Sequence, residues 1–357
     1  MSTAIEWTDE VWNPVTGCTK VSQGCKNCYA ERLFPRVYGK NLLINKTAAL
    51  GTARDQMRTL EEARPREFTD VLTHADRLEQ PLKWKRPRRI FVNSMSDLFH
   101  EDVPSDFIAA VFAVMHARTD HTFQILTKRA ARMLAFSRWL DGVGGIGPFT
   151  RANPDVLRKW FGRLFPTIFN AAAVWHAGPA DNVWLGVSVE DQDTFDERVE
   201  ILGRVPAAVR FISYEPALGP IDCGNAFDGP VEGSPYGEIH WLIAGGESGP
   251  NARPAHPDWF RSVRDQCQAA GVSFFFKQWG EWTPDPELGR PYRALHMKAM
   301  PPALGSIEPL LGGRAFVAWE RETSPGCFEG TQLVRVGKKK AGRELDGRTW
   351  DEFPEAR

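Results

Sequence analysis

The sequence has almost no net charge and no long hydrophobic run. Its 44 Lys and Arg residues face 45 Asp and Glu residues, which leaves a formal charge of −1. No global field therefore attracts nucleic acid or a membrane surface, and such a partner would have to meet a local patch. No run of 18 apolar residues exists, so no membrane-spanning helix is expected. The start, MSTAIEWTDEVW, is acidic and lacks an apolar core, so no signal peptide is expected.

Cysteine is also scarce, but its few copies are concentrated. Three of the six lie within eleven residues, as Cys18, Cys25 and Cys28 in a C-x6-C-x2-C pattern. A cysteine cluster without a secretory signal indicates a reducing compartment and a metal site, not disulfides. We therefore predict a cytoplasmic protein, without a membrane partner, that uses these three thiols as metal ligands.

Two kinds of metal centre fit three clustered thiols. Thiolates are soft ligands that suit zinc or an iron–sulfur cluster. A structural zinc site usually has four protein ligands; the candidates for a distant fourth are His74, His100 and Cys327. A cubic [4Fe-4S] cluster on three cysteines would instead leave one iron open for a cofactor or substrate. The spacing alone leaves both alternatives open.

Short apolar runs alternate with helical patterns along most of the chain. The expected strands are 89–93, 121–126, 183–188, 209–213, 239–244 and 272–276. The expected helices are 105–117, 130–139, 194–202 and 257–270. Apolar strands separated by helices are typical of a parallel sheet with covered faces. We predict an α/β fold, a partial (β/α) barrel of about six or seven parallel strands, with a doubly wound open sheet as the alternative.

The predicted barrel occupies residues 1–282, with two stretches that interrupt the repeat. These insertions lie near 34–88 and 140–182. Residues 283–357 are rich in Pro and Gly, with expected strands near 315–319 and 332–336. We predict that this tail is a cap packed on the barrel, not an independent domain.

Polar side chains follow the expected strands. They are Ser96, Asp97, Lys128, Ser188, Glu190, Glu215 and Glu247. In parallel α/β folds the carboxyl ends of the strands carry the functional site. The cysteine loop follows a short strand of its own and is expected at the same edge.

The cysteine loop resembles the cluster loop of radical S-adenosylmethionine enzymes. Asn13-Pro14-Val15-Thr16-Gly17-Cys18 and Gly24-Cys25-Lys26-Asn27-Cys28-Tyr29-Ala30 match the N-P-x-x-G-C and G-C-x-x-C-Y-A pattern of the spore-photoproduct-lyase-like branch. That branch has three residues between its first two cysteines, whereas this chain has six. Nearly the whole chain resembles a phage- and bacteria-associated three-Cys-motif family of unknown function. Its hallmarks here include 92–100, 126–129, 186–190, 245–249 and 345–348.

This resemblance implies a function and assigns roles. Cys18, Cys25 and Cys28 would hold a [4Fe-4S] cluster that binds S-adenosylmethionine at its open iron. The implied cofactor-binding residues are Tyr29, Ser96, Asp97, Lys128, Ser188 and Glu190. Glu215 and Glu247 would reach the substrate as catalytic residues. The expected substrate is a nucleic acid base that is modified or repaired, and a protein partner of the three-Cys-motif type is also expected.

A basic run supports the nucleic-acid expectation. Five cations in seven residues, Lys83, Lys85, Arg86, Arg88 and Arg89, surround Trp84, which could stack on a base. The alternative interpretation is a solvated approach to a strand. Gly142–Gly147 satisfies G-x-G-x-x-G but follows a helical pattern, so we predict a loop and not a dinucleotide site.

Two other functions remain open from the sequence. One is a non-catalytic, zinc- or cluster-containing protein of nucleic-acid binding or phage defence. The other is an enzyme whose cluster serves only structure or redox sensing. The strand-end residues also have structural alternatives: Asp97 as a turn cap, Lys128 as a solvated helix start, and Glu190 as part of an acidic helix N-terminus.

Overall fold

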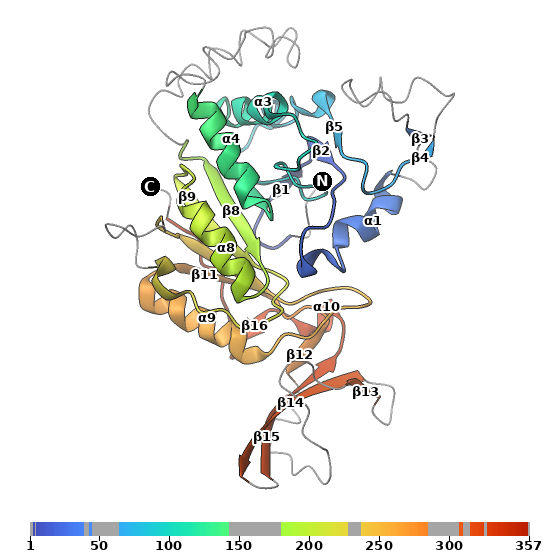
Figure 1. Ribbon diagram of the computed structural model, residues 1–357, viewed down its shortest axis with the longest axis vertical. Helices are drawn as coiled ribbons and strands as arrows, with labels where there is room; N and C mark the ends of the chain where they lie inside the picture. Colours follow the sequence, from blue (N-terminus) through green and yellow to red (C-terminus); the bar gives the residue numbers. More distant parts are fainter. Residues whose placement is uncertain are drawn as a thin grey trace.

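A computed structural model describes residues 3, 5–38, 43–44, 64–142, 180–227, 237–284, 307–309, 315–324 and 327–355. Its centre is one sheet of seven parallel strands that follow each other in chain order (Figure 1). The strands are β1 Glu10–Trp12, β6 Arg89–Val92, β7 Thr122–Thr127, β8 Val183–Val189, β9 Val209–Tyr214, β10 Trp241–Gly245 and β11 Ser273–Gln278. The sequence-based strands are thus confirmed to within a few residues.

The strand order decides between the two predicted architectures. The order β1-β6-β7-β8-β9-β10-β11 never reverses. Right-handed crossovers between successive neighbours place all connecting helices on the same face. These helices are α3 Ser105–His116, α4 Ala130–Gly142, α8 Gln192–Gly203 and α9 Pro257–Ala270. The sheet curls into a half-barrel with helices outside, so the α/β partial-barrel prediction is confirmed and the doubly wound alternative is wrong.

Local sequence signals set the helix boundaries. The side chain of Asp191 accepts a hydrogen bond from the Thr194 backbone N–H, which begins α8 with a capping box. Gly271 ends α9 in the left-handed conformation, at φ 69°. The predicted start of α3 at residue 105 is confirmed. Pro104 takes the cap position without a side-chain bond and Ser105 is the first helical residue.

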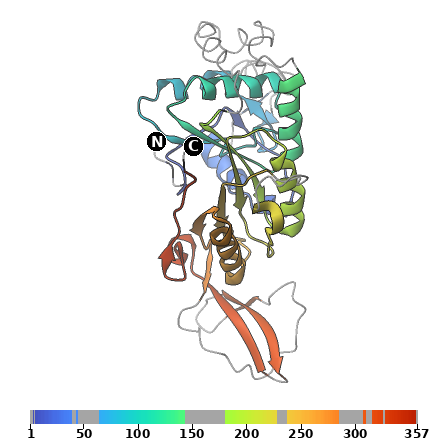
Figure 2. The same cartoon turned by 90° about the vertical axis from the view of Figure 1, so that its left-hand side faces the viewer.

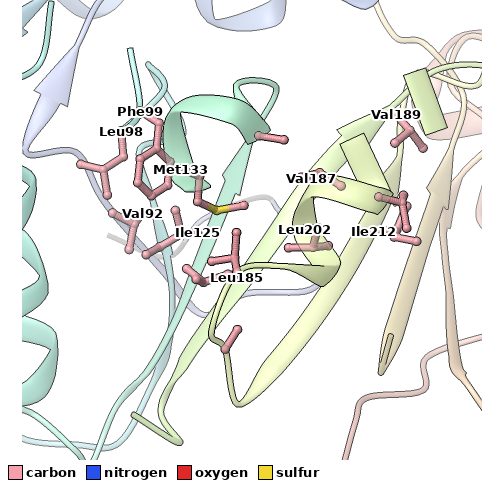
Figure 3. Packing of buried hydrophobic residues seen from close by; sticks show 14 of the residues in the cluster. Val92, Leu98, Phe99, Ile125, Met133, Leu185, Val187, Val189, Leu202 and Ile212 are labelled. Atoms are coloured by element: carbon pink, nitrogen blue, oxygen red, sulfur yellow. The ribbon is translucent and has the colours of Figure 1, made fainter. Parts of the chain in front are cut away.

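The main core lies between the sheet and the helices. Figure 3 shows Ile125, Leu185 and Val187 from the strands facing Met133 of α4 and Leu202 of α8. All of these side chains are buried. Alternate residues of each strand point to this layer because side chains alternate across a strand. In each strand, the side chains that point outward from the barrel therefore pack against the helices.

The inner face of the curled sheet holds a second, aromatic cluster. Its buried members are Trp7, Phe91, Trp184, Val209, Phe211, Trp241, Ile243 and Phe275. Gly186 of β8 leaves room for this packing, because a Cβ there would be 2.5 Å from the Phe211 ring. The strand-flanking tryptophans Trp241, Trp279 and Trp282 are all buried. Each donates its indole N–H to a backbone carbonyl, so they serve packing and not an open stacking platform.

The first predicted insertion is irregular with short elements. The helix α1 Tyr29–Tyr38 follows the cysteine loop, and the short strands form the pairs β2 Val15–Thr16 with β5 Leu72–Thr73 and β3 Leu43–Ile44 with β4 Arg64–Pro65. The short 3-10 helices η3 Ala75–Arg77 and η4 Pro81–Lys83 lead into β6. Of the second predicted insertion, residues 143–179 lie outside the described residues, as does most of the glycine-rich motif.

The C-terminal residues do two different things. The antiparallel sheet β12-β15-β14-β13 is formed by β12 Trp282–Pro284, β13 Ile307–Pro309, β14 Ala315–Ser324 and β15 Cys327–Arg335. Figures 1 and 2 show β14 and β15 extending away from the parallel sheet. The segment with α10 Lys338–Ala341, β16 Glu344–Leu345 and β17 Arg348–Thr349 returns to the barrel.

This returning segment covers the last barrel strand. The backbone N–H of Phe276 donates to Trp350 O at 2.9 Å, and Glu352 N donates to Phe274 O at 3.2 Å. The outer edge of β11 is thereby paired and closed to other chains. The division into a barrel and a cap at residues 282 and 283 stays a prediction. In the part of the chain that the structure describes, no helix has the length and apolar character needed to span a membrane.

Candidate functional site

The cysteine loop lies at the carboxyl edge of the parallel sheet. Asn13, just after β1, accepts the Met95 backbone N–H at 3.0 Å through Oδ1. Asn93, just after β6, accepts the Val15 N–H at 3.2 Å in the same way. The hydroxyl of Ser96 donates to Val15 O at 2.9 Å. The entry to the loop is therefore bonded to the segment after β6, and Ser96 takes part in that attachment.

The three predicted metal ligands all lie in this loop or at its end. Cys25 ends the 3-10 helix η1 Gln23–Cys25, and Cys28 precedes α1. All three thiols are partly buried. Burial raises the pKa of Cys18 to about 12, and the charges of Asp97 and Cys25 add to the rise against the opposing effect of Arg129. Burial also raises the pKa of Cys28, with the same contribution from Cys25, so Cys25 lies near both other thiols.

The first attachment of the loop is the ion pair Asp97–Arg129. Asp97 accepts Thr127 Oγ1 at 2.7 Å and lies 3.3 Å from Arg129 Nη1. The same nitrogen of Arg129 is 3.6 Å from Cys18 Sγ, and its Nη2 donates to Thr19 Oγ1 at 2.8 Å. Asp97 thus fixes the end of β7 and directs Arg129 at the first cysteine.

The second attachment is centred on Glu190, which has no exposed surface. Its carboxylate lies 2.6 Å from Lys128 Nζ and 3.1 Å from Arg198 Nη1, and it accepts Ser22 Oγ at 2.9 Å. Burial would raise the pKa of Glu190, but the two cations outweigh it and hold the pKa below its usual value. Gly24 makes this approach feasible, because a Cβ there would be 2.3 Å from Glu190 Oε1.

The third attachment is the ion pair Glu247–Arg253 after β10. Arg253 donates from Nη2 to Oε1 at 2.6 Å and from Nε to Oε2 at 2.9 Å. Asn27, between the last two cysteines, donates to Glu247 Oε2 at 3.0 Å, and Arg253 also donates to Gln23 O. Burial would raise the pKa of Glu247, but the hydrogen bonds from Arg253 and Asn27 hold it below its usual value.

We call Asp97–Arg129, Glu190–Arg198 and Glu247–Arg253 the anchor pairs. They extend from three separate places on the sheet edge to three points along one loop. Sequence reasoning named the carboxylates but missed Arg198, Arg253 and Asn27. Arg198 did carry a signal, because it occupies the buried stripe of α8 with Phe195, Val199 and Leu202. Arg253 and Asn27 lie in irregular segments, where no helical or strand periodicity in the sequence points to them.

Several sequence-predicted residues at the same edge are not part of the anchor pairs. Glu215, after β9, bonds Lys277 of β11 at 2.7 and 2.8 Å. Its side chain is 20% exposed, and among the described residues its carboxylate makes no hydrogen bond or ion pair to the cysteine loop. Tyr29 is 40% exposed and donates its hydroxyl to Ser94 O at 2.6 Å. Lys128 and Ser188 bond to each other beside Glu190.

A family comparison covers nearly the whole chain. The family described as Protein of unknown function (DUF5131) matches residues 2–354. The chain belongs to this family. No curated protein and no solved structure matches it. The predicted membership in a family of unknown function is confirmed, and the family description adds no substrate.

The arrangement of the thiols in this DUF5131 chain bears on which metal group they could hold. Within the described ranges, no three or more His, Cys, Asp or Glu side chains are placed to hold a single metal ion. Cysteines on a cubic cluster each bind a different iron, so they surround a larger group and need not converge on a point. The donor set of three thiols, with an N–H donor from Arg129 at Cys18, fits such a cluster.

The zinc alternative needs a fourth ligand that the described residues do not bring to the thiols. His74 Nε2 lies 2.7 Å from Thr16 Oγ1, and burial lowers the pKa of His74 to about 3. His100 Nε2 lies 2.8 Å from Thr19 Oγ1. Both histidines are engaged with threonine hydroxyls, while the side chain of Cys327 lies outside the described residues.

The basic run of the DUF5131 chain lies away from this site. It precedes β6, so it stands at the amino end of the strands, opposite the cysteine loop. Lys83 pairs with Glu79; Arg88 and Arg89 pair with Glu10 and Asp9. Lys85 and Arg86 are exposed. Nucleic-acid contact through this run stays a prediction, and its position separates it from the chemistry proposed below.

Proposed function

We propose that the chain is an iron–sulfur enzyme of the radical S-adenosylmethionine type, with a [4Fe-4S] cluster on Cys18, Cys25 and Cys28. The observation that carries the proposal is the position of the three-cysteine loop at the carboxyl edge of a parallel half-barrel, attached there by the anchor pairs. A catalytic group needs its supporting residues held by packing and hydrogen bonds from rigid elements. Attachment to β6, β8 and β10 meets that need.

The cluster and S-adenosylmethionine would together supply a one-electron reductive bond cleavage that no side chain can perform. The chain's own residues would position the cluster and the cofactor and shield them from water. Lys128, partly exposed beside Ser188, suits a carboxylate or hydroxyl of the cofactor. Asp97, Ser96 and Glu190 hold the loop and Lys128 in place. The contacts of Glu247 favour the same role of holding the loop over the substrate role inferred from the sequence. Of the two predicted catalytic residues, Glu215 is then the one that would reach the substrate.

The test is anaerobic reconstitution of the full chain with iron and sulfide, followed by electron paramagnetic resonance of the reduced protein. We expect a cubic-cluster signal that shifts when S-adenosylmethionine is added. Cys25→Ser should lose the signal. Cys223→Ala and Cys267→Ala, at buried cysteines remote from the loop, should retain it.

Two results would overturn the proposal. Retention of stoichiometric zinc without any cluster would make the loop a structural knot and favour a non-catalytic binding protein. A cluster whose signal ignores S-adenosylmethionine would favour a structural or redox-sensing role. Contact with nucleic acid or with a three-Cys-motif partner remains a prediction separate from this test.

A further inference from the structure

Three side chains at the ends of β9 and β11 form a second polar group on the sheet edge. Glu215 and Lys277 belong to strands that are not neighbours, since β10 lies between them. Their side chains meet above Gly245, the last residue of β10, where a Cβ would make an ordinary 3.4 Å contact with the Glu215 carboxylate. Gln278 joins them, with Nε2 3.4 Å from Glu215 Oε1.

This group has hydrogen-bonding capacity to spare. Gln278 is only 4% exposed, yet its Oε1 has no partner among the described residues. The contact of Nε2 with Glu215 fixes the orientation of the amide, so the free atom is an acceptor. Lys277 directs two bonds to Glu215, and its ammonium carries three N–H groups. One acceptor and one charged donor are therefore available side by side.

An aromatic residue, Tyr29, lies at the same edge of the sheet, where it is bonded to the segment after β6. The hydroxyl of Tyr29 is tied to Ser94 O, while 40% of the residue is exposed. Tyr29 directly follows Cys28 and begins α1, so it stands beside the cysteine loop. An anchored, partly exposed ring is a stacking surface for a flat ligand.

We propose that Lys277, Gln278, Glu215 and Tyr29 form the substrate site, and that the substrate is a nucleobase with a lactam edge, a ring N–H beside a carbonyl. The carbonyl accepts from Lys277, the ring N–H donates to Gln278 Oε1, and Tyr29 covers the face. This inference rests on the proposed function for its chemistry, since Tyr29 directly follows Cys28, but its binding step stands independently of the cluster.

The other carboxylates of the edge do not suit this role. Glu190 and Glu247 are buried and bonded to arginine and to the loop, and Asp97 accepts bonds from Thr127 and Arg129. A ligand would have to displace those bonds. Beside Glu215 it would find the third N–H of Lys277 and the Oε1 of Gln278, which has no partner among the described residues. A mismatched ligand would leave that acceptor unpaired.

The experiment is calorimetric titration of the full chain with thymidine and with guanosine. The matched probes are the same nucleosides methylated at the ring N–H. We expect at least one parent nucleoside to bind and its methylated form to bind at least tenfold more weakly, because a donor is lost and an acceptor stays unpaired. Equal binding of parent and methylated forms, or no binding of either parent, would overturn the inference.

Variants localise the binding. Gln278→Leu and Lys277→Met should each weaken binding of the parent nucleoside at least tenfold, while Gln268→Leu, at an exposed glutamine of α9, should not. If Lys277→Met fails to fold, the double variant Lys277→Met with Glu215→Gln keeps the charges balanced and tests the same donor. Unchanged binding of the parent nucleoside by the Gln278→Leu variant would show that Gln278 takes no part in binding and would overturn the inference.

The two proposals fail separately. A cluster that responds to S-adenosylmethionine in a chain that binds no nucleoside would retain the proposed function and reject this substrate. Nucleoside binding that depends on Gln278 in a zinc-loaded chain would retain the site and reject the radical chemistry.

Discussion

Three consecutive strand ends, those of β8, β9 and β10, each carry a glutamate, and the three are used differently. Glu190 and Glu247 are buried, are held by arginine and bond the cysteine loop. Glu215 is partly exposed and is held by lysine, and among the described residues its carboxylate makes no such bond to the loop. A planar guanidinium holds a carboxylate in fixed geometry, whereas an ammonium on a flexible stem is a movable partner. The comparison separates residues that hold the loop from one that faces a ligand.

The largest effect is expected from Glu190→Ala. Lys128 and Arg198 would lose their shared carboxylate, and a buried cation without its partner costs about 3–5 kcal/mol of unfolding free energy. Chemical denaturation monitored by tryptophan fluorescence measures the loss. Glu200→Ala, which breaks a surface pair with Arg204 on the same helix, should cost less than about 1 kcal/mol. Equal costs would show that Glu190 is no anchor.

Gly24→Ala tests the anchor from the side of the loop. The new methyl group would meet the Glu190 carboxylate at 2.3 Å and displace either the loop or its attachment. We expect a tenfold or greater loss of iron affinity, about the effect typical of altering groups that orient metal ligands. Iron per chain after reconstitution at limiting iron reports it. Gly219→Ala, whose Cβ would make an ordinary 3.4 Å contact, should load normally.

Glu247→Gln sharpens the comparison through pH. The folded-state pKa of Glu247 lies below its ordinary 4.5, so its ionised form stabilises the fold above that pH. This contribution disappears as pH falls through the lowered pKa. At neutral pH the variant should be less stable by about 1.5–3 kcal/mol, the value of a hydrogen bond to a charged group. Denaturation at neutral and strongly acidic pH should show this difference vanish; a difference that persists in acid would contradict the assignment.

The sequence predicted the scaffold well because its signals are local. The apolar run 239–244 predicts a strand, which the structure has at Trp241–Gly245, and Gly271 marks a helix end through its own backbone. The common edge followed from parallel topology alone. The position of the basic run also follows, since residues that precede β6 must lie at its amino end.

The sequence could not show which of the three glutamates hold the cysteine loop and which one faces a ligand. Each of Glu190, Glu215 and Glu247 simply follows an apolar strand, and their partners Arg198, Lys277 and Arg253 lie at separations of 8, 62 and 6 residues. Which cation meets which carboxylate depends on the curl of the sheet and on the path of the loop. No local pattern encodes those distances.

We expect the smallest loss of stability from Glu215→Gln. Because the variant should fold normally, it can separate an effect on ligand binding from an effect on folding. The pair with Lys277 is partly exposed, and such pairs contribute less than about 1 kcal/mol. The variant should therefore fold and load iron like the wild type, in contrast to Glu190→Ala and Glu247→Gln. Nucleoside binding should nevertheless weaken, because Glu215 orients both Lys277 and Gln278. If Glu215→Gln instead lowered iron loading, Glu215 would act as a fourth anchor, and the separation between loop-holding and ligand-facing carboxylates would fail.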